Sequence, residues 1–221
     1  MIEVREVSKS LKNSNILKDI NLSLYKGKIY GIKGINGSGK TMLLRVICGL
    51  LIPDKGSVMI DSKELHKVIS FPPSVGAVIE MPEFLPQFTG RKNLEILAGI
   101  NNKIDDNAII QSLKVVGLDP NDRRKYRKYS LGMKQRLSIA QAIMESPDLL
   151  ILDEPTNALD QNTITGLTQF LLDYKTKGKC IIVSSHDFQF LETISDEIFH
   201  IENGKIINHS IIKFNTKTVL K

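Results

Sequence analysis

Apolar and polar residues alternate in blocks that predict strands near the start of the chain. Three strand-like runs cover residues 2–4, 20–24 and 28–32. Turn-forming residues, among them Asn13, Ser14 and Gly27, separate the runs. This spacing predicts an antiparallel β subdomain over residues 1–33.

The pattern changes after residue 41, where apolar residues recur at helical spacing. Residues 42–47 predict a helix, whereas 56–61 and 75–80 predict strands, the second apolar enough to be buried. From about residue 89 to residue 130, helical segments at 91–98 and 106–116 alternate with polar loops. We expect this stretch to be a helical subdomain inserted into an α/β core.

The rest of the chain alternates between helix and strand. Helices are expected at residues 131–145 and 161–175, strands at 149–152 and 180–184, and a closing β region at 198–207. Strands that alternate with helices predict a mainly parallel sheet with both faces covered. We therefore expect residues 1–221 to form a single α/β domain.

Length, cysteine usage and charge narrow the protein class. A chain of 221 residues can bury a sizeable core. Cys48 and Cys180 lie in apolar settings, so buried free thiols are expected rather than a disulfide or a metal site. The chain opens without a secretory signal and has no apolar run near the roughly 20 residues that a membrane-spanning helix needs, so we expect a soluble cytoplasmic protein. The net charge of +6 permits contact with nucleic acid or anionic membrane, but a lysine-rich solvated surface explains it equally well.

The sequence GINGSGKT, residues 34–41, fits the phosphate-binding P-loop pattern G-x-x-x-x-G-K-[ST]. A strand is expected before it and a helix after it, which is the order that the loop needs and which counts against an unliganded glycine-rich turn. We expect Lys40 to reach the β- and γ-phosphates of a nucleoside triphosphate and the Thr41 hydroxyl to bind Mg²⁺. The loop residues expected to bind the nucleotide are Gly34, Asn36, Gly37, Ser38, Gly39, Lys40, Thr41 and Met42.

Two carboxylates end the apolar strand at residues 149–152. In a P-loop protein, a carboxylate at this position holds the Mg²⁺ shell and a second one orients or deprotonates the attacking water. Asp153 is therefore the expected metal ligand and Glu154 the expected catalytic carboxylate. A solvated strand end is the alternative, and the P-loop upstream counts against it.

The sequence YSLGMKQR, residues 129–136, completes a resemblance to the nucleotide-binding subunit of ATP-binding cassette (ABC) transporters over essentially the whole chain. It matches the family's LSGGQ-type signature in a variant form. The resemblance implies that Ser130 and Gly132 face the γ-phosphate of ATP on a second cassette. It also implies a dimer-contacting D-loop at residues 158–160 and a catalytic role for His186, which senses the γ-phosphate.

Several positions depart from the family pattern. Leu11 stands where an aromatic residue would stack on adenine, so base recognition should be weak. Glu80 replaces the Q-loop glutamine, where a carboxylate can still meet Mg²⁺ but adds negative charge near the phosphates. Tyr129 replaces the first signature residue, and Met42 leaves only a backbone N–H for the α-phosphate. Glu80 together with the variant signature resembles cassettes of bacitracin and lantibiotic exporters and their immunity systems.

The resemblance implies an ATPase subunit with ATP and Mg²⁺ as cofactors. It implies a head-to-tail dimer, expected to be a homodimer, that drives a separate permease from the inner face of the cell membrane. The loop over residues 81–91, with Met81, Phe84, Leu85 and Phe88, is expected either to be core or to dock that permease.

Two other functions remain open for this chain. An ATPase acting on nucleic acid or ribosomes would use the basic stretch at residues 123–128, although a solvated loop is preferred there and no nucleic acid partner is expected. A regulatory clamp that binds ATP without turnover is disfavoured because Lys40, Asp153, Glu154 and His186 are all present.

Overall fold

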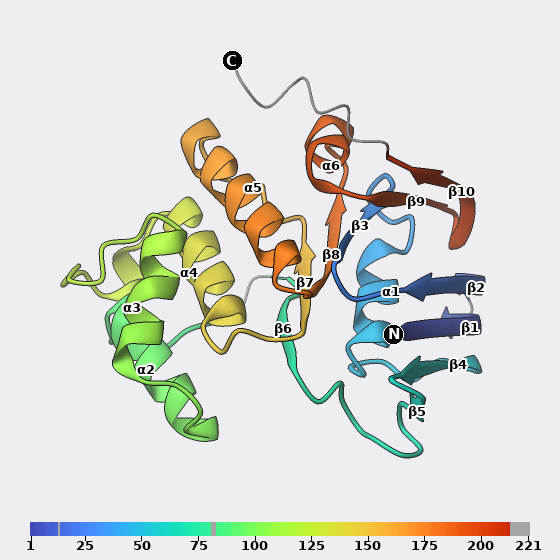
Figure 1. Cartoon of the computed structure of the whole chain (residues 1–221), viewed down its shortest axis with the longest axis horizontal. Helices are drawn as coiled ribbons and strands as arrows, with labels where there is room; N and C mark the ends of the chain where they lie inside the picture. The colour runs from blue at the N-terminus through green and yellow to red at the C-terminus, as the bar shows by residue number, and fades with distance from the viewer. Residues whose placement is uncertain (13, 81–82, 213–221) are drawn as a thin grey trace.

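The computed structural model describes residues 1–12, 14–80 and 83–212, and in them two sheets lie side by side with helices around them. Figure 1 shows the antiparallel strands at one end of the molecule, the helices α2 and α3 at the other end, and the larger sheet between them. No helix in these residue ranges is long and apolar enough to cross a membrane.

The smaller sheet is antiparallel and has four strands in the order β2-β1-β4-β5. Its strands are β1 Ile2–Leu11, β2 Ser14–Leu24, β4 Lys55–Ile60 and β5 Lys63–Glu64. Two details of the predicted β lead-in were wrong. Ser14 is the first residue of β2 and pairs with Leu11, and the third run, residues 28–32, lies in the other sheet, while β4 takes its place here. Asn13 lies outside the described residues.

The larger sheet has six strands in the order β10-β9-β3-β8-β7-β6. They are β3 Lys28–Lys33, β6 Val75–Val78, β7 Leu149–Asp153, β8 Cys180–Ser185, β9 Glu197–Glu202 and β10 Lys205–Ile211. Every pairing is parallel except that of β10 with β9, which confirms the predicted mainly parallel sheet. β6 is an edge strand and is only half-buried, whereas the sequence predicted a buried strand.

The helices follow the predicted segments closely, with one addition. They are α1 Lys40–Ile47, α2 Gly90–Asn101, α3 Asp106–Val115, α4 Leu131–Ile143, α5 Gln161–Thr176 and α6 Phe188–Ile194. The sequence did not predict α6. Its signal was short: Asp187 caps the helix by accepting a hydrogen bond from the Phe190 N–H at 3.1 Å, and Phe190, Leu191 and Ile194 are buried.

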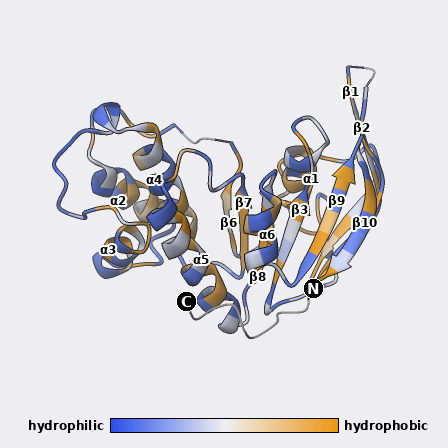
Figure 2. Cartoon of the chain, turned by 90° about the horizontal axis from the view of Figure 1, so that it is seen from above, coloured by the Kyte–Doolittle hydropathy of each residue, from blue (hydrophilic) through white to orange (hydrophobic). Residues whose placement is uncertain are grey.

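Alternate residues of each central strand enter different cores. In β7, Leu150 and Leu152 pack with the core beneath α2 to α6, whereas Leu149 and Ile151 pack with the core shared by α1 and the antiparallel sheet. Figure 2 shows hydrophobic residues gathered where strands face helices. Both faces of the parallel sheet are therefore covered, as strands with continuous apolar runs require.

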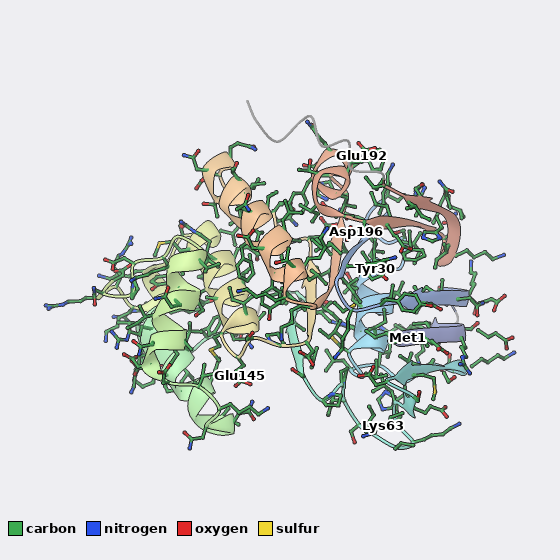
Figure 3. All side chains as sticks on the ribbon, viewed as in Figure 1. Met1, Tyr30, Lys63, Glu145, Glu192 and Asp196 are labelled. Atoms are coloured by element: carbon green, nitrogen blue, oxygen red, sulfur yellow. The ribbon has the colours of Figure 1, made fainter. Side chains whose placement is uncertain are left out.

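The burial of Tyr30 and of the two cysteines agrees with this arrangement of layers. Tyr30 is fully buried between the sheets, whereas Lys63 and Glu192 lie at the periphery (Figure 3). The Tyr30 hydroxyl accepts a hydrogen bond from the Tyr25 N–H at 2.7 Å, and burial raises its pKa. Cys48 and Cys180 are free and buried, as predicted, and burial raises the pKa of each thiol to about 12.

The segment after β6 is tied to the segment before α4. The Tyr126 N–H donates to the Phe88 carbonyl at 2.8 Å, and the rings of Phe84 and Tyr126 meet edge-on at 5.3 Å. Phe84 is only 8% exposed, so it is a core residue and not the docking residue that was the other expectation for it. Leu85 is exposed, and Met81 lies outside the described residues.

The tight approach of β6 to α4 gives a prediction about stability. A Cβ on Gly76 would lie 1.9 Å from the Ala142 carbonyl oxygen, so Gly76→Ala must push the strand and helix apart. We expect it to lower the free energy of unfolding by roughly 1–3 kcal/mol, the usual cost of overpacking. Chemical denaturation measures this change.

The matched control for this variant is Gly99→Ala in α2, where a Cβ would have no neighbour within 4 Å. Replacing a glycine inside a helix should raise stability by about 0.5–1 kcal/mol. Equal stability of Gly76→Ala and the wild type would show that the strand and helix are not held in this contact.

Candidate functional site

Three parallel strands end side by side where the sequence motifs lie. Lys33 of β3 pairs with Ser185 of β8, and Asp153 of β7 pairs with Ser184 of β8. Because parallel strands present their carboxyl ends at one edge, the loops that follow β3, β7 and β8 meet there. This is the edge at which open α/β sheets bind ligands.

The P-loop turns tightly between β3 and α1. A Cβ on Gly34 would lie 2.5 Å from the Ile201 carbonyl oxygen, so no larger residue fits there. Gly39 has φ +112°, in the left-handed region that favours glycine, and precedes α1 without a side-chain cap. The Ser38 hydroxyl is buried and has no hydrogen-bond partner in the described residues. A loop with an uncapped helix start and a spare hydroxyl is suited to an anion.

Lys40 is buried in the loop that precedes it. Its side chain is 5% exposed and donates to the carbonyl oxygens of Gly34 at 2.7 Å and Ile35 at 3.2 Å. Its Nζ also lies 3.1 Å from Oε1 of Glu154. The ammonium group therefore connects the P-loop to the end of β7.

Asp153 binds two hydroxyl groups from different elements. Its Oδ2 accepts a hydrogen bond from the Thr41 hydroxyl at 2.6 Å, and its Oδ1 accepts one from the Ser184 hydroxyl. Ser184 also accepts a hydrogen bond from the Glu154 N–H at 3.1 Å. The sequence did not single out Ser184, although its place in VSSHD at the end of an apolar strand was the available signal.

Glu154 and His186 are in direct contact. His186 Nδ1 lies 2.8 Å from Oε2 of Glu154, and the His186 backbone N–H donates to the same oxygen at 3.3 Å. Glu154 has φ +48°, an uncommon conformation for a residue with a side chain. Its two carboxylate oxygens thus have separate partners, Lys40 on one and His186 on the other.

A cavity of about 380 Å³ opens over the P-loop. It is in the size range of small-molecule sites. Its lining residues are Leu11, Ile16, Asn36, Gly37, Gly39, Lys40, Thr41, Met42, Glu80 and Glu154. Leu11 is 41% exposed here, so the residue found in place of the expected aromatic does face this cavity.

Glu80 lines the cavity from the end of β6, but its carboxylate is engaged elsewhere. Its Oε1 lies 2.6 Å from Nη2 of Arg45, which is in the last turn of α1. The sequence did not identify Arg45. The spacing from Thr41, one helical turn, was the signal that could have found it.

The signature residues lie apart from the cavity lining. Ser130 caps α4 by accepting a hydrogen bond from the Met133 N–H at 3.2 Å, as its sequence context indicated. A Cβ on Gly132 would lie 2.6 Å from the Ala158 carbonyl oxygen, so the signature packs against the loop after β7. The buried Tyr129 hydroxyl accepts a hydrogen bond from the Gly90 N–H at 3.2 Å, which ties the signature to the start of α2.

Comparison with known proteins identifies the family. A family model described as ABC transporter matches residues 17–157. The chain is 46% identical to the uncharacterized ABC transporter ATP-binding protein YybJ of Bacillus subtilis over 93% of this chain and 94% of that protein. It is 39% identical to the bacitracin transport ATP-binding protein BcrA of Enterococcus faecalis, covering 94% of this chain and 68% of BcrA. It is 34% identical to the lantibiotic transport ATP-binding protein SrtF of Streptococcus pyogenes, covering 94% and 89%.

A solved structure shares the fold. The dimeric structure of MJ0796, a bacterial ABC transporter cassette, superposes with a TM-score of 0.87 at 24% identity, over 96% of this chain and 99% of that one. This agreement and the relatives above confirm both the α/β cassette fold and the resemblance to bacitracin and lantibiotic cassettes that the sequence indicated. The chain belongs to the ABC transporter family, as one of its ATP-binding cassettes.

Proposed function

We propose that this ATPase cassette powers a separate membrane permease that exports antimicrobial peptides or confers immunity to them. One observation carries the catalytic part of the proposal: Glu154 contacts both Lys40 of the P-loop and His186 after β8. The peptide substrate class is supported by the bacitracin and lantibiotic transport names of two relatives.

The P-loop is proposed to hold the triphosphate of ATP. The phosphates would meet the backbone N–H groups of Asn36, Gly37, Gly39 and Met42 and the start of α1, with Gly34 allowing the close turn. The spare hydroxyl of buried Ser38 fits an additional phosphate contact. Lys40 would exchange its carbonyl partners for phosphate oxygens.

The residues beside the P-loop fit a Mg²⁺ ion that arrives with the nucleotide. Thr41 and Asp153 present adjacent oxygen atoms that could bind the ion, whereas Glu80, which lines the same cavity, has its carboxylate on Arg45 and would first have to release it to become a ligand. No cluster of three or more histidine, cysteine, aspartate or glutamate side chains suited to a metal occurs in residues 1–12, 14–80 and 83–212. Mg²⁺ commonly binds through one or two carboxylates and substrate phosphates, so no such cluster is needed. When bound, the ion offsets charge on the phosphate oxygens.

Glu154 is the proposed general base for hydrolysis. Its carboxylate is 17% exposed, and both oxygens are held, so it has a defined orientation toward the cavity that it lines. His186 positions this carboxylate and is proposed to hold the γ-phosphate and the attacking water. Lys40 stabilises the negative charge on the transferred group.

The cassette is proposed to act as a head-to-tail homodimer. Ser130 and Gly132 do not line the P-loop cavity, and we infer from the family resemblance that they serve a nucleotide on another subunit. Ser130 sits at the N-terminus of α4, where helix N–H groups favour an anion. The dimeric structure of MJ0796 supports the proposal of a dimer.

A groove beside β6 is the proposed permease contact, which would place the cassette on the inner face of the membrane. The groove has a volume of about 590 Å³ and lies between residues 71–76 and the helices α2 and α4. Phe71 is 55% exposed and Ile100 is 75% exposed at its rim, an unusual exposure for large apolar side chains. These residues replace the buried Phe84 as the expected docking residues.

The first functional prediction concerns Glu154. Glu154→Gln keeps the size of the side chain but removes the base, so turnover should fall by roughly 10²–10⁴-fold while ATP binding persists. We expect ATP to hold the variant as a dimer in size-exclusion chromatography. The matched control is Glu192→Gln on the exposed face of α6, which should not change turnover. Near-normal turnover of Glu154→Gln would show that Glu154 is not the base.

The second functional prediction concerns Leu11. Because stacking of a base on an aromatic ring contributes roughly 1–3 kcal/mol, Leu11→Tyr should tighten ATP binding several-fold and increase the preference for ATP over GTP. Titration with both nucleotides measures this. Leu50→Tyr, at an exposed leucine outside the cavity lining, is the control. An unchanged affinity for Leu11→Tyr would place adenine elsewhere.

The third functional prediction separates the transporter function from action on nucleic acid. Ile100→Asp should reduce co-sedimentation with membranes that contain the permease and leave ATP binding intact, whereas Ile207→Asp on β10 should not. Charge reversal of residues 123–128 should leave co-sedimentation intact. Tight, salt-sensitive nucleic acid binding that this reversal abolishes, with unchanged sedimentation of Ile100→Asp, would favour the other function.

A further inference from the structure

The ion pair between Arg45 and Glu80 borders the P-loop cavity, because Glu80 is one of the lining residues. The Arg45 Nη2 and Glu80 Oε1 atoms are 2.6 Å apart, and the side chains are 33% and 63% exposed. Glu80 lines the cavity together with Lys40, Thr41 and Glu154. The pair is therefore next to the residues that are proposed to hold the nucleotide.

Helix geometry places Arg45 on the face of α1 that carries Thr41, a residue of the cavity lining. α1 begins at Lys40, and Thr41 and Arg45 are four residues apart, so they share one face of the helix. The chain after β6 approaches the same face, and Glu80 adopts φ +64°, which is uncommon for a residue with a side chain. Two independent elements thus converge on a single charged contact.

The carboxylates of the site differ in how their charge is balanced. Asp153 accepts hydrogen bonds from two hydroxyl groups, and Glu154 has Lys40 and His186. In the described part of the chain, Arg45 is the side chain that contacts the Glu80 carboxylate. Without Arg45, the cavity would present an unpaired, exposed carboxylate to an incoming polyanion, and like charges repel, to an extent that salt screens.

We propose that Arg45 is a positioning residue for Glu80, whose carboxylate it holds beside α1 and neutralises, so that a nucleoside triphosphate meets a neutral pair. This role explains how an acidic residue is accommodated at the end of β6. The inference rests on the proposed nucleotide site. Exposed ion pairs contribute little to stability, so the role should be visible in nucleotide affinity and not in unfolding.

A double-mutant cycle tests this inference, with the equilibrium binding of metal-free ATP in EDTA as the readout. The variants are Arg45→Gln, Glu80→Gln and the double variant, each measured at low and at high salt. Arg45→Gln should weaken ATP binding about 3- to 10-fold at low salt and less at high salt, because exposed charges are screened. Glu80→Gln should bind ATP at least as tightly as the wild type, and the double variant should match Glu80→Gln within about two-fold.

Two controls separate this role from a structural one. Arg45→Lys keeps the charge and should bind ATP nearly as the wild type does. Arg124→Gln removes another exposed arginine that is paired with a carboxylate, that of Asp122 at 2.7 Å, outside the cavity lining, and should not change ATP binding. The unfolding midpoints of all these variants should agree with that of the wild type.

Specific results would overturn the inference. If Arg45→Gln weakens ATP binding equally with and without Glu80, Arg45 acts on the nucleotide itself and not through Glu80. If Arg45→Gln leaves the affinity unchanged at low salt, the pair has no role in binding. Failure of the wild type to bind ATP would instead contradict the proposed function, which keeps the two failures distinguishable.

Discussion

The Asp153 carboxylate connects three segments that are far apart in the sequence. It binds the hydroxyl of Thr41 at the start of α1 and that of Ser184 near the end of β8, while its own strand lies between β6 and β8. Hydrogen bonds to an ionised carboxylate are about twice as strong as those between neutral groups. The relative positions of the P-loop, Glu154 and His186 all depend on this contact, since each lies within two residues of Thr41, Asp153 or Ser184.

Much of the fold could be predicted from the sequence because local patterns determine it. The P-loop pattern, the four apolar residues before Asp153 and the capping of α4 by Ser130 each need only a short window. Sheet membership could not be predicted in this way. Residues 28–33 and 55–60 are both short β runs, and only pairing with distant strands places the first in the parallel sheet and the second beside β1.

The site could be predicted to the same extent, and its prediction failed where long-range contacts decide a residue's role. Lys40, Thr41, Asp153 and Glu154 stand in recognisable motifs, whereas Ser184 and Arg45 acquire a role only through partners 31 and 35 residues away. Phe84 shows the reverse error, because a loop rich in proline suggested exposure and the ring in fact packs on Tyr126. Tertiary contacts determine the burial and the role of such residues, and a single sequence does not show those contacts directly.

The resting contacts of Lys40 have a thermodynamic consequence. Its ammonium already has two carbonyl oxygens and a carboxylate as partners, so ligand entry exchanges contacts and does not simply add them. The binding free energy is then a difference between two sets of interactions, which lowers the affinity for a highly charged ligand below what the new contacts alone would give. The same exchange leaves Glu154 Oε1 without its cation. Under the proposed mechanism, a phosphate that attracts Lys40 would thereby free the carboxylate proposed to activate water, so ligand arrival and readiness for chemistry would be one event.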